Sequence, residues 1–591
     1  MIRREWLALV GLATIPWFSL RAEGSKLSPD LRDNLTPGRP AVQVIIQWKQ
    51  LPGWLQAEKI RQRQGVVKQN FHAVQATLAA LPAEQLAGLA SDLDVDYITP
   101  DRPLKGTLDY SAPTVGATLA FRSGWTGKGV AVAVIDSGVG YHPDLADVIG
   151  GQAGTSRVVY SENFVPGESS AADTYGHGTH VAGIVGGYGA TSTDPNYKVS
   201  IQGMAPGVKI VNLRVLNGTG AGRDSDVIRA IERAIALKNQ YNIRIINLSL
   251  GRPVFESYTL DPLCRAVETA WNAGILVVVA AGNEGRNNSA GTNGYGTIGS
   301  PANHPLALTV GAMKTMFTPQ RGDDLIASYS SKGPTLIDHV VKPDIVAPGN
   351  RIISLSNGKK SYLSLNFPQT EVPVSYYKYT SSAATSDSYM WLSGTSMATP
   401  MVSGSAALML EKESVLTPDQ LKARLMKTAS KSFPVSSTTT DPSTGLTYTS
   451  QYDIFTVGAG YLDVAAALSN CEVARGVAVS PSAAVVKRGV TVYIPKGTAW
   501  STNAVWGDQT GWSLNAVWGD KVFLNGSNAV WGNNAVWGDN AVWGDSTSTG
   551  YNAVWGDNAV WGDNAVWGDN AVWGDLVSPF SALKILIYGE Q

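Results

Sequence analysis

The segment Leu392-Ser-Gly-Thr-Ser-Met-Ala-Thr-Pro400 places a serine, Ser396, at the expected start of a helix. Gly394 permits a tight turn before it, and the small residues Gly404-Ser-Ala406 allow that helix to pack closely against its neighbours. A serine at a helix N-terminus lies beside free backbone N–H groups and the positive end of the helix dipole. This position suits a nucleophile whose product is an oxyanion, but a serine hydroxyl needs a base and an orienting acid to react.

Two other segments supply candidates for that acid and that base. The run Gly129-Val-Ala-Val-Ala-Val-Ile135 is continuously apolar, which predicts a strand buried on both faces of a parallel sheet. Asp136 follows it, at the strand end where catalytic groups of open α/β sheets gather. His177 lies in Tyr175-Gly-His-Gly-Thr-His-Val-Ala-Gly183, whose continuation predicts a buried helix. Taken alone, such an aspartate is often a cap and such a histidine a turn residue.

Together the three motifs resemble those of the subtilases, the subtilisin-type serine peptidases. They occur in the order Asp, His, Ser that is typical of subtilisins, and the similarity extends from about Pro113 to Leu468. The resemblance implies an α/β fold: a subtilisin-like catalytic domain with a central parallel sheet and helices on both faces. It also implies that Ser396 attacks the scissile carbonyl, that His177 takes and later returns the proton, and that Asp136 orients the imidazole.

A fourth catalytic residue is expected at Asn283. The run Gly274-Ile-Leu-Val-Val-Val-Ala-Ala-Gly-Asn-Glu-Gly285 predicts another buried strand, which ends shortly before this asparagine. In subtilases the matching amide and the N–H of the nucleophile bind the developing oxyanion. Alternatively, Asn283 is a turn residue that tolerates unusual dihedral angles.

Several segments resemble the substrate-binding parts of subtilases. Val215–Gly222 and Ile246–Gly251 match the two backbone segments that hold an extended peptide as an added strand. Gly299-Ser-Pro301 resembles the base of the pocket for the side chain before the scissile bond. A pocket with a glycine floor and one carboxylate at its rim favours large apolar or aromatic side chains and some basic ones. The expected substrate-binding residues are Gly220, Gly222, Ser249, Gly251, Glu284 and Gly299.

A structural calcium ion is a further expectation from the resemblance. His142-Pro-Asp-Leu145 matches a turn whose aspartate binds calcium in many subtilases, which makes Asp144 a candidate ligand. The turn is one residue shorter than usual, however, and the loop from Gly186 to Gly203 departs from the family pattern. Calcium takes six to eight oxygen ligands, of which the sequence nominates one. We interpret His180 as a packed helix residue. No cofactor is expected for peptide-bond hydrolysis itself.

The length and charge of the chain limit the remaining possibilities. At 591 residues it is too long for one core and predicts several domains. Its net charge of −1 argues against nucleic acid as a partner. Arg3-Arg4, the apolar run to Leu20 and the small residue Ala22 predict a signal peptide over residues 1–22, and hence a secreted or cell-surface protein. A retained N-terminal anchor is the alternative.

Residues 23–110 resemble the inhibitory propeptide of subtilases, a small α+β domain. Val42–Trp48 alternates like a strand, and Pro82–Ala90 has the pattern of an amphipathic helix. Such a domain would act as the intramolecular inhibitor and folding template of the enzyme, with self-cleavage expected between about Pro103 and Ser111. The alternative is an accessory domain that the mature enzyme keeps.

The rest of the chain divides by composition. We expect the peptidase domain over 111–470, a linker over 471–502, repeats over 503–575 and a C-terminal segment over 576–591. An insertion over 355–389 is either a surface hairpin or a border of the substrate cleft. The cysteines, Cys264 and Cys471, are expected to be unpaired, with Cys264 in a buried helix.

The repeat Asn-Ala-Val-Trp-Gly occurs nine times between Asn503 and Gly574, usually followed by Asp. Short stacked strands with a ladder of indoles are one expectation, and a low-complexity tail that binds partners through tryptophan is the other. Either form could attach the protein to a cell surface or a polysaccharide.

The sequence as a whole leaves two candidate functions. The first is a secreted serine endopeptidase acting on proteins or peptides. The second is a surface or assembly protein whose peptidase domain only processes itself.

Overall fold

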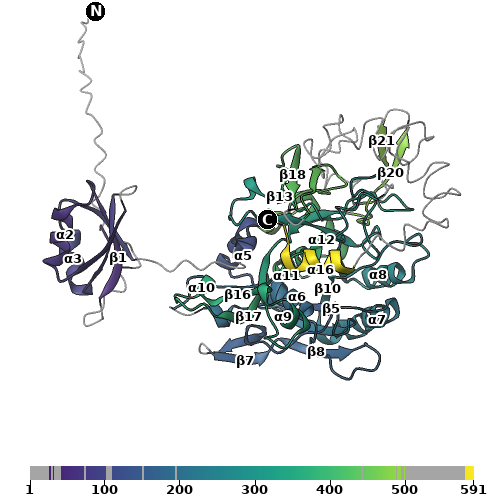
Figure 1. Ribbon diagram of the computed structural model, residues 1–591, viewed down its shortest axis with the longest axis horizontal. Coiled ribbons are helices and arrows are strands. Elements are labelled where there is room, and N and C mark those ends of the chain that lie inside the picture. Colours follow the sequence, from purple (N-terminus) through teal and green to yellow (C-terminus); the bar gives the residue numbers. More distant parts are fainter. Residues whose placement is uncertain are drawn as a thin grey trace, which may run out of the picture. The chain divides into compact units, whose positions relative to one another are not determined.

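The computed structural model describes part of the chain. The signal peptide expected over 1–22 and the repeats over 503–575 lie outside it. The chain forms two compact units, Met1–Leu104 and Lys105–Gln591 (Figure 1). The described residues are 26–27, 31, 41–71, 75–100, 110–149, 152–193, 196–289, 291–441, 444–486, 489–493, 498–499 and 579–590.

The first unit is a four-stranded antiparallel sheet with helices packed on it. Its first strand matches the predicted one. The helix predicted over Pro82–Ala90 begins instead as a 3₁₀ turn, Ala83–Gln85, and becomes α-helical only from Leu86. The strands, in sheet order, are β2 (Val66–Phe71), β3 (Ala76–Leu81), β1 (Val42–Trp48) and β4 (Val95–Pro100), and the helices are α2 (Trp54–Arg61) and α3 (Leu86–Ala90).

The second unit is built on an eight-stranded sheet whose ladders are parallel except at one edge, where β13 is antiparallel. This confirms the expected α/β fold class. In sheet order the strands are β13 (Leu325–Ile326), β12 (Leu308–Lys314), β11 (Leu276–Ala280), β10 (Ile243–Leu248), β5 (Ala131–Asp136), β9 (Lys209–Arg214) and β8 (Val158–Asn163), with β14 (Ile345–Pro348) also paired to β12.

Helices cover both faces of this sheet. Ala133 and Ile135 of β5 pack into a core with α7 (Asp224–Tyr241) and α8 (Pro262–Asn272). The alternate residue Val134 packs into the other core. That core contains α6 (His177–Gly186) and α11 (Thr395–Lys412). Because both sides of each central strand are buried, these strands are continuous apolar runs rather than alternating ones.

This arrangement brings the carboxyl ends of the central strands and the N-termini of α6 and α11 to one edge. β5 ends at Asp136, and β11 ends shortly before Asn283. α6 begins at His177, and Ser396 is the second residue of α11. The smaller elements of the unit are α4 (Ser111–Thr114), α5 (Ala117–Arg122), β6 (Ala146–Ile149), β7 (Gln152–Ser156), α12 (Pro418–Thr428), β18 (Ser436–Thr440), β19 (Thr447–Gln451), α13 (Val464–Ser469), β20 (Ser482–Val486) and β21 (Gly489–Tyr493).

The insertion over 355–389 is not a simple hairpin. Together with the residues that flank it, it forms a three-stranded antiparallel sheet in the order β15, β17, β16, and it carries two short helices. The elements of residues 352–392 are β15 (Ile352–Leu355), α9 (Tyr362–Asn366), β16 (Glu371–Pro373), α10 (Val374–Tyr377) and β17 (Thr385–Leu392).

The C-terminal helix α16 (Pro579–Tyr588) belongs to the second unit and is drawn in yellow in Figure 1. Both cysteines are free, as expected, and Cys264 is buried in α8. Among the described helices, none combines the length and apolar character needed to cross a membrane.

Candidate active site

Asp136 and His177 form a buried acid–base pair. The His177 Nδ1 lies 2.8 Å from Asp136 Oδ1, and the Asp136 carboxylate is fully buried. The backbone N–H of Ser137 also donates to Oδ1, at 2.7 Å. With Nδ1 donating to the carboxylate, Nε2 of the neutral imidazole is left as the proton acceptor.

The electrostatics of His177 are dominated by burial and by Asp136. Burial alone would lower the pKa of the imidazole, because it disfavours the charged form. The charge of Asp136 and its hydrogen bond act in the opposite sense and outweigh burial, so the pKa of His177 is raised above its usual value of 6.5. The pair therefore stabilises the imidazolium that forms when this histidine accepts a proton.

A second buried carboxylate, Asp173, positions His177 and was not identified from the sequence. Its Oδ1 accepts from Gly176 N at 2.7 Å and from the Ser137 hydroxyl at 2.9 Å, while Oδ2 accepts from both N and Oγ1 of Thr179. Asp173 thus caps the N-terminus of α6 and joins it to the turn after Asp136. An aspartate a few residues before a predicted helix start is the signal that could have revealed it.

Ser396 is held in a reciprocal pair with Ser249. The Ser396 hydroxyl donates to the backbone oxygen of Ser249 at 3.0 Å, and the Ser249 hydroxyl donates to the backbone oxygen of Ser396 at 2.7 Å. Pro400 explains the second bond: it has no N–H, so the Ser396 carbonyl lacks its usual helical donor. The hydroxyl of Ser249 takes that donor's place and ties the start of α11 to the end of β10.

The side chain of Asn283 is oriented by the residue before the serine. Its Oδ1 accepts from the backbone N–H of Thr395 at 2.9 Å and from the Thr395 hydroxyl at 3.1 Å. With the carbonyl oxygen fixed in this way, the amide hydrogens of Asn283 are the donors that remain for a ligand. Their nitrogen lies near the turn at Gly394, where an added Cβ would be 3.2 Å from it.

One cavity of about 1100 Å³ joins the expected residues. It is lined by Ser396, His177 and Asn283, so the expected nucleophile, base and amide donor face the same space. Asp136 lies behind His177 rather than in the cavity wall. All the expected substrate-binding residues also line it: Gly220, Gly222, Ser249, Gly251, Glu284 and Gly299.

The glycines of the cleft are required by close approaches. Gly220 has a φ of +82°, and an added Cβ would lie 2.7 Å from the ring of Tyr175. At Gly299 an added Cβ would lie 2.8 Å from the backbone oxygen of Arg252. Glu284 is half-buried, and burial raises the pKa of its carboxyl. The cavity therefore combines backbone walls with one desolvated acid.

The insertion contributes Tyr362 to the lining of this cavity. The sequence had left open whether the insertion borders the cleft. Tyr362 N donates to the backbone oxygen of Thr174 at 2.9 Å, and its ring stacks on Tyr175 at a centroid distance of 5.9 Å. Both tyrosines line the cavity, and the Tyr175 ring lies 6.3 Å from that of His177. One element of the insertion thus borders the cleft.

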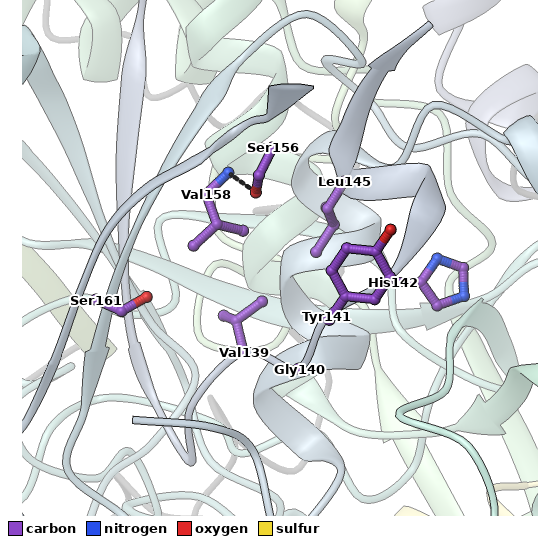
Figure 2. Close-up of a pocket in the computed structure, with 8 residues that line it drawn as sticks. All are labelled: Val139, Gly140, Tyr141, His142, Leu145, Ser156, Val158 and Ser161. Atoms are coloured by element: carbon purple, nitrogen blue, oxygen red, sulfur yellow. Dashed lines mark hydrogen bonds between the residues drawn. The ribbon is translucent and has the colours of Figure 1, made fainter. Parts of the chain in front are cut away.

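A smaller cavity of about 220 Å³ lies beside the turn after β5 (Figure 2). It contains Ser156 and Ser161, and His142 is the only titratable base among its lining residues. Both nitrogens of His142 are engaged by the backbone: Nδ1 accepts from Asp144 N, and Nε2 lies 3.1 Å from the Ser388 oxygen. In Figure 2 its ring lies on the other side of Tyr141 from Ser161. This cavity therefore holds no pair of nucleophile and base.

The surroundings of Asp144 do not fit a calcium ion. Its Oδ1 accepts from N and Oγ1 of Thr191, at 2.8 and 2.9 Å, and its Oδ2 accepts from the Tyr389 hydroxyl at 2.7 Å. Calcium needs oxygen ligands that are free to coordinate it. Among the described residues, no group of three or more acidic, histidine or cysteine side chains could hold a metal.

A buried guanidinium lies where backbone oxygens converge near Asp144. Arg157 donates to the backbone oxygens of Asp144 and Gly186, each at 2.7 Å, and of Val208, at 2.9 Å. Burial lowers the pKa of Arg157 to about 10, so the side chain is charged at neutral pH. The positive charge that these backbone oxygens contact is thus the guanidinium of Arg157 itself.

A buried acid, an oriented imidazole and a helix-borne serine, with an amide donor beside them, are the groups that serine hydrolases use. The comparisons agree. The subtilase family matches residues 127–453. The chain is 35% identical over 404 residues to serine protease AprX of Bacillus subtilis (strain 168), covering 66% of this chain and 82% of that protein.

Two further relatives show the same relationship. Subtilisin E of Bacillus subtilis (strain 168) is 33% identical over 394 residues, covering 65% of this chain and 84% of that protein. The alkaline protease of Shouchella clausii is 33% identical over 363 residues, covering 61% and 75%. The chain belongs to the subtilase family and is a subtilisin-like serine endopeptidase.

Proposed function

We propose that Asp136, His177 and Ser396 are the catalytic triad of this endopeptidase. The observation that carries the proposal is the 2.8 Å bond between His177 Nδ1 and Asp136, beside a cavity that His177 shares with Ser396. Reaction requires the Ser396 hydroxyl to leave the Ser249 oxygen and donate to His177 Nε2. Such bonds are often completed only when substrate is present.

The chemistry follows from these roles. As Ser396 Oγ bonds to the substrate carbonyl carbon, its proton passes to His177 Nε2, and the carbonyl oxygen becomes an oxyanion. Collapse of this intermediate breaks the peptide C–N bond, and His177 gives the proton to the leaving amine. Water then attacks the acyl carbon while His177 takes its proton, and His177 returns that proton to the departing Ser396 Oγ. Asp136 keeps its hydrogen bond to Nδ1 and stabilises the imidazolium each time it forms.

Asn283 and the backbone N–H of Ser396 would bind the oxyanion. Thr395 supports this role because it holds the oxygen end of the Asn283 amide and leaves the donor end available. The peptide before the scissile bond would pair with Gly220–Gly222 and Ser249–Gly251 as an added strand. Gly299 and Glu284 would receive its last side chain, with a preference for large apolar or aromatic residues and some basic ones.

Hydrolysis of casein tests this proposal. We expect a fluorophosphonate to inhibit the full-length protein, and Ser396→Ala to lower the activity by about 10⁶-fold, as the loss of a triad serine does. Ser123→Ala changes an exposed serine that does not line this cavity and should leave the activity unchanged. Casein hydrolysis that survives in Ser396→Ala would overturn the proposal.

We also propose that the enzyme is exported and made as a zymogen. The signal-like residues 1–22 support export, and a separately folded first unit before the peptidase supports a propeptide over 23–110. Ser396→Ala should then remain uncut between Pro103 and Ser111 when purified. Normal processing of that variant would point to another protease.

The repeats over 503–575 would attach the enzyme to a cell surface or polysaccharide, supported by their regularly spaced tryptophans. The second candidate function, a surface or assembly protein that only processes itself, rests on the same repeats. It would gain if the purified protein cleaved its own chain but no casein.

A further inference from the structure

The C-terminal end of the chain forms part of the substrate cleft. Leu583 and Leu586 of α16 line the same cavity as Ser396 and Asn283. Three consecutive residues of the helix, Ile585–Ile587, are each at most 9% exposed. Because successive residues of a helix point about 100° apart, burial of all three means that the peptidase domain surrounds most of this turn. Leu583 and Leu586 are the two residues of the helix that line the cavity.

Main-chain bonds fasten this helix beside the nucleophile. The N–H of Ser393 donates to the backbone oxygen of Leu586 at 2.9 Å. Gly589 approaches the same serine closely, because an added Cβ would lie 2.3 Å from Ser393 Oγ. Asn350 makes a reciprocal pair with the backbone of Glu590, both bonds being 2.7 Å long. The chain end is thus bonded to the segments before β15 and before α11.

Glu590 anchors the helix through a buried carboxylate that is only 4% exposed. Its Oε1 lies 2.6 Å from Lys314 Nζ. Its Oε2 lies 3.1 Å from an Arg286 nitrogen and accepts from both N and Oγ of Ser328. A buried carboxylate is stable only when charged or hydrogen-bonding partners surround it, so these contacts specify one position for the chain end.

The order of the strands indicates on which side of the scissile bond helix α16 lies. Gly220–Gly222 follows β9 and Ser249–Gly251 follows β10, whereas Lys314 ends β12 and Asn350 follows its neighbour β14. The strand leading to Asn283, β11, lies between β10 and β12. Two anchors of α16, Lys314 and Asn350, therefore lie across Asn283 from the segments proposed to bind the peptide before the scissile bond. A third, Arg286, lies in the segment that directly follows Asn283.

We infer that the C-terminal segment 579–590 forms the wall for the leaving-group side of the substrate, where Leu583 and Leu586 select an apolar side chain after the scissile bond. The inference rests on the proposed function. The cavity that the two leucines line is about 1100 Å³, slightly above the usual range of about 300–1,000 Å³ for ligand sites, so the helix lines the cleft and does not fill it.

Peptides that differ only in the residue after the scissile bond test this inference. For the full-length enzyme, kcat/KM should be higher with leucine there than with glycine. Leu583→Ala and Leu586→Ala should lower that leucine-to-glycine ratio about tenfold, as removal of part of an apolar subsite does. The phenylalanine-to-alanine ratio for the residue before the bond should stay the same. Because each ratio is taken within one enzyme, the amount of folded protein cancels.

The matched control is Lys584→Ala, which changes an exposed residue of the same helix and should leave both ratios unchanged. Leu583 is only partly buried, so Leu583→Ala gives the result if Leu586→Ala does not fold. Unchanged ratios, or an equal fall in both, would overturn the inference. So would a truncation of 579–591 that raises kcat/KM equally for all peptides, because the segment would then be a plug. Failure of the full-length enzyme to cleave any peptide would instead overturn the proposed function.

Glu590→Gln keeps the shape of the anchor but removes its charge. We expect it to lower the same leucine-to-glycine ratio, because the ion pairs with Lys314 and Arg286 hold the helix in position. An unchanged ratio would overturn the anchoring role of this carboxylate.

Discussion

At the scale of single residues, His177 depends on a balance between burial and one carboxylate. The raised pKa of this histidine comes from Asp136, which outweighs the desolvation of the ring. The neutral imidazole is the form that can accept the serine proton. Activity should therefore rise with pH as His177 loses its proton, with a midpoint above 6.5, the usual value for histidine.

Asp136→Asn should separate the two effects. Burial remains while the opposing charge is lost, so the pKa of His177 should fall and the acid limb of the kcat/KM profile should move to lower pH. The rate itself should fall about 10⁴-fold, because the imidazole loses its orientation. Asp387→Asn is the control, since that side chain is 74% exposed. An acid limb that stays in place in Asp136→Asn would contradict this account of His177.

At the scale of elements, the most informative departure from the sequence-based expectation is the turn at Asp144. The motif suggested calcium, yet Tyr389 of β17 and Thr191 donate to the carboxylate, and Arg157 collects the nearby carbonyl oxygens. Tyr389 comes from the insertion, far along the chain from Asp144. No local sequence pattern indicates a hydrogen bond from so distant a hydroxyl group. The sequence alone therefore could not predict that side chains, rather than a calcium ion, contact Asp144.

Thermal unfolding should show the consequence. In the Ser396→Ala background, which prevents self-digestion, a chelator should change the Tm by no more than about 2 °C. Arg157→Met should destabilise the fold by about 3 kcal/mol or more, because it leaves buried carbonyl oxygens unpaired. Arg265→Met changes an exposed arginine and should have little effect. If a chelator lowered the Tm of the protein that retains Arg157 by many degrees, the interpretation that the guanidinium takes the place of a calcium ion would be contradicted.

The central strands and the candidate catalytic residues at their ends were predictable because their signals are local. Continuous apolar runs before Asp136 and Asn283 indicated buried strands, and small residues after Ser396 indicated a closely packed helix. Asp173, Tyr362 and the partners of Glu590 were not predicted. Their roles arise from contacts between segments distant in sequence, which periodicity does not encode.

At the scale of the whole molecule, the peptidase unit includes the chain end as well as residues before the repeats. Ala499 N donates to the backbone oxygen of Val477, and α16 is bonded beside Ser393. The segment that carries the repeats therefore connects two attachment points on the same unit. A truncation near Ala499 would remove α16 together with the repeats and mix two effects.

An internal deletion of 503–575 that keeps 579–591 distinguishes them. If the repeats serve attachment, this deletion should abolish binding to cell walls or insoluble polysaccharide in a pull-down, while peptide hydrolysis and its leucine-to-glycine ratio stay unchanged. Deletion of 579–591 alone should leave this binding intact and lower the leucine-to-glycine ratio. Binding that survives loss of the repeats would contradict their proposed role.

The central claim is that Ser396 is the nucleophile of a subtilase. Labelling the full-length protein with a fluorophosphonate and mapping the modified residue by mass spectrometry tests it most directly. We predict one adduct, on the peptide that contains Ser396, with loss of casein hydrolysis in proportion to labelling and no adduct in Asp136→Asn or His177→Ala at the same exposure time. An adduct on another serine, or full activity after complete labelling of Ser396, would contradict the claim.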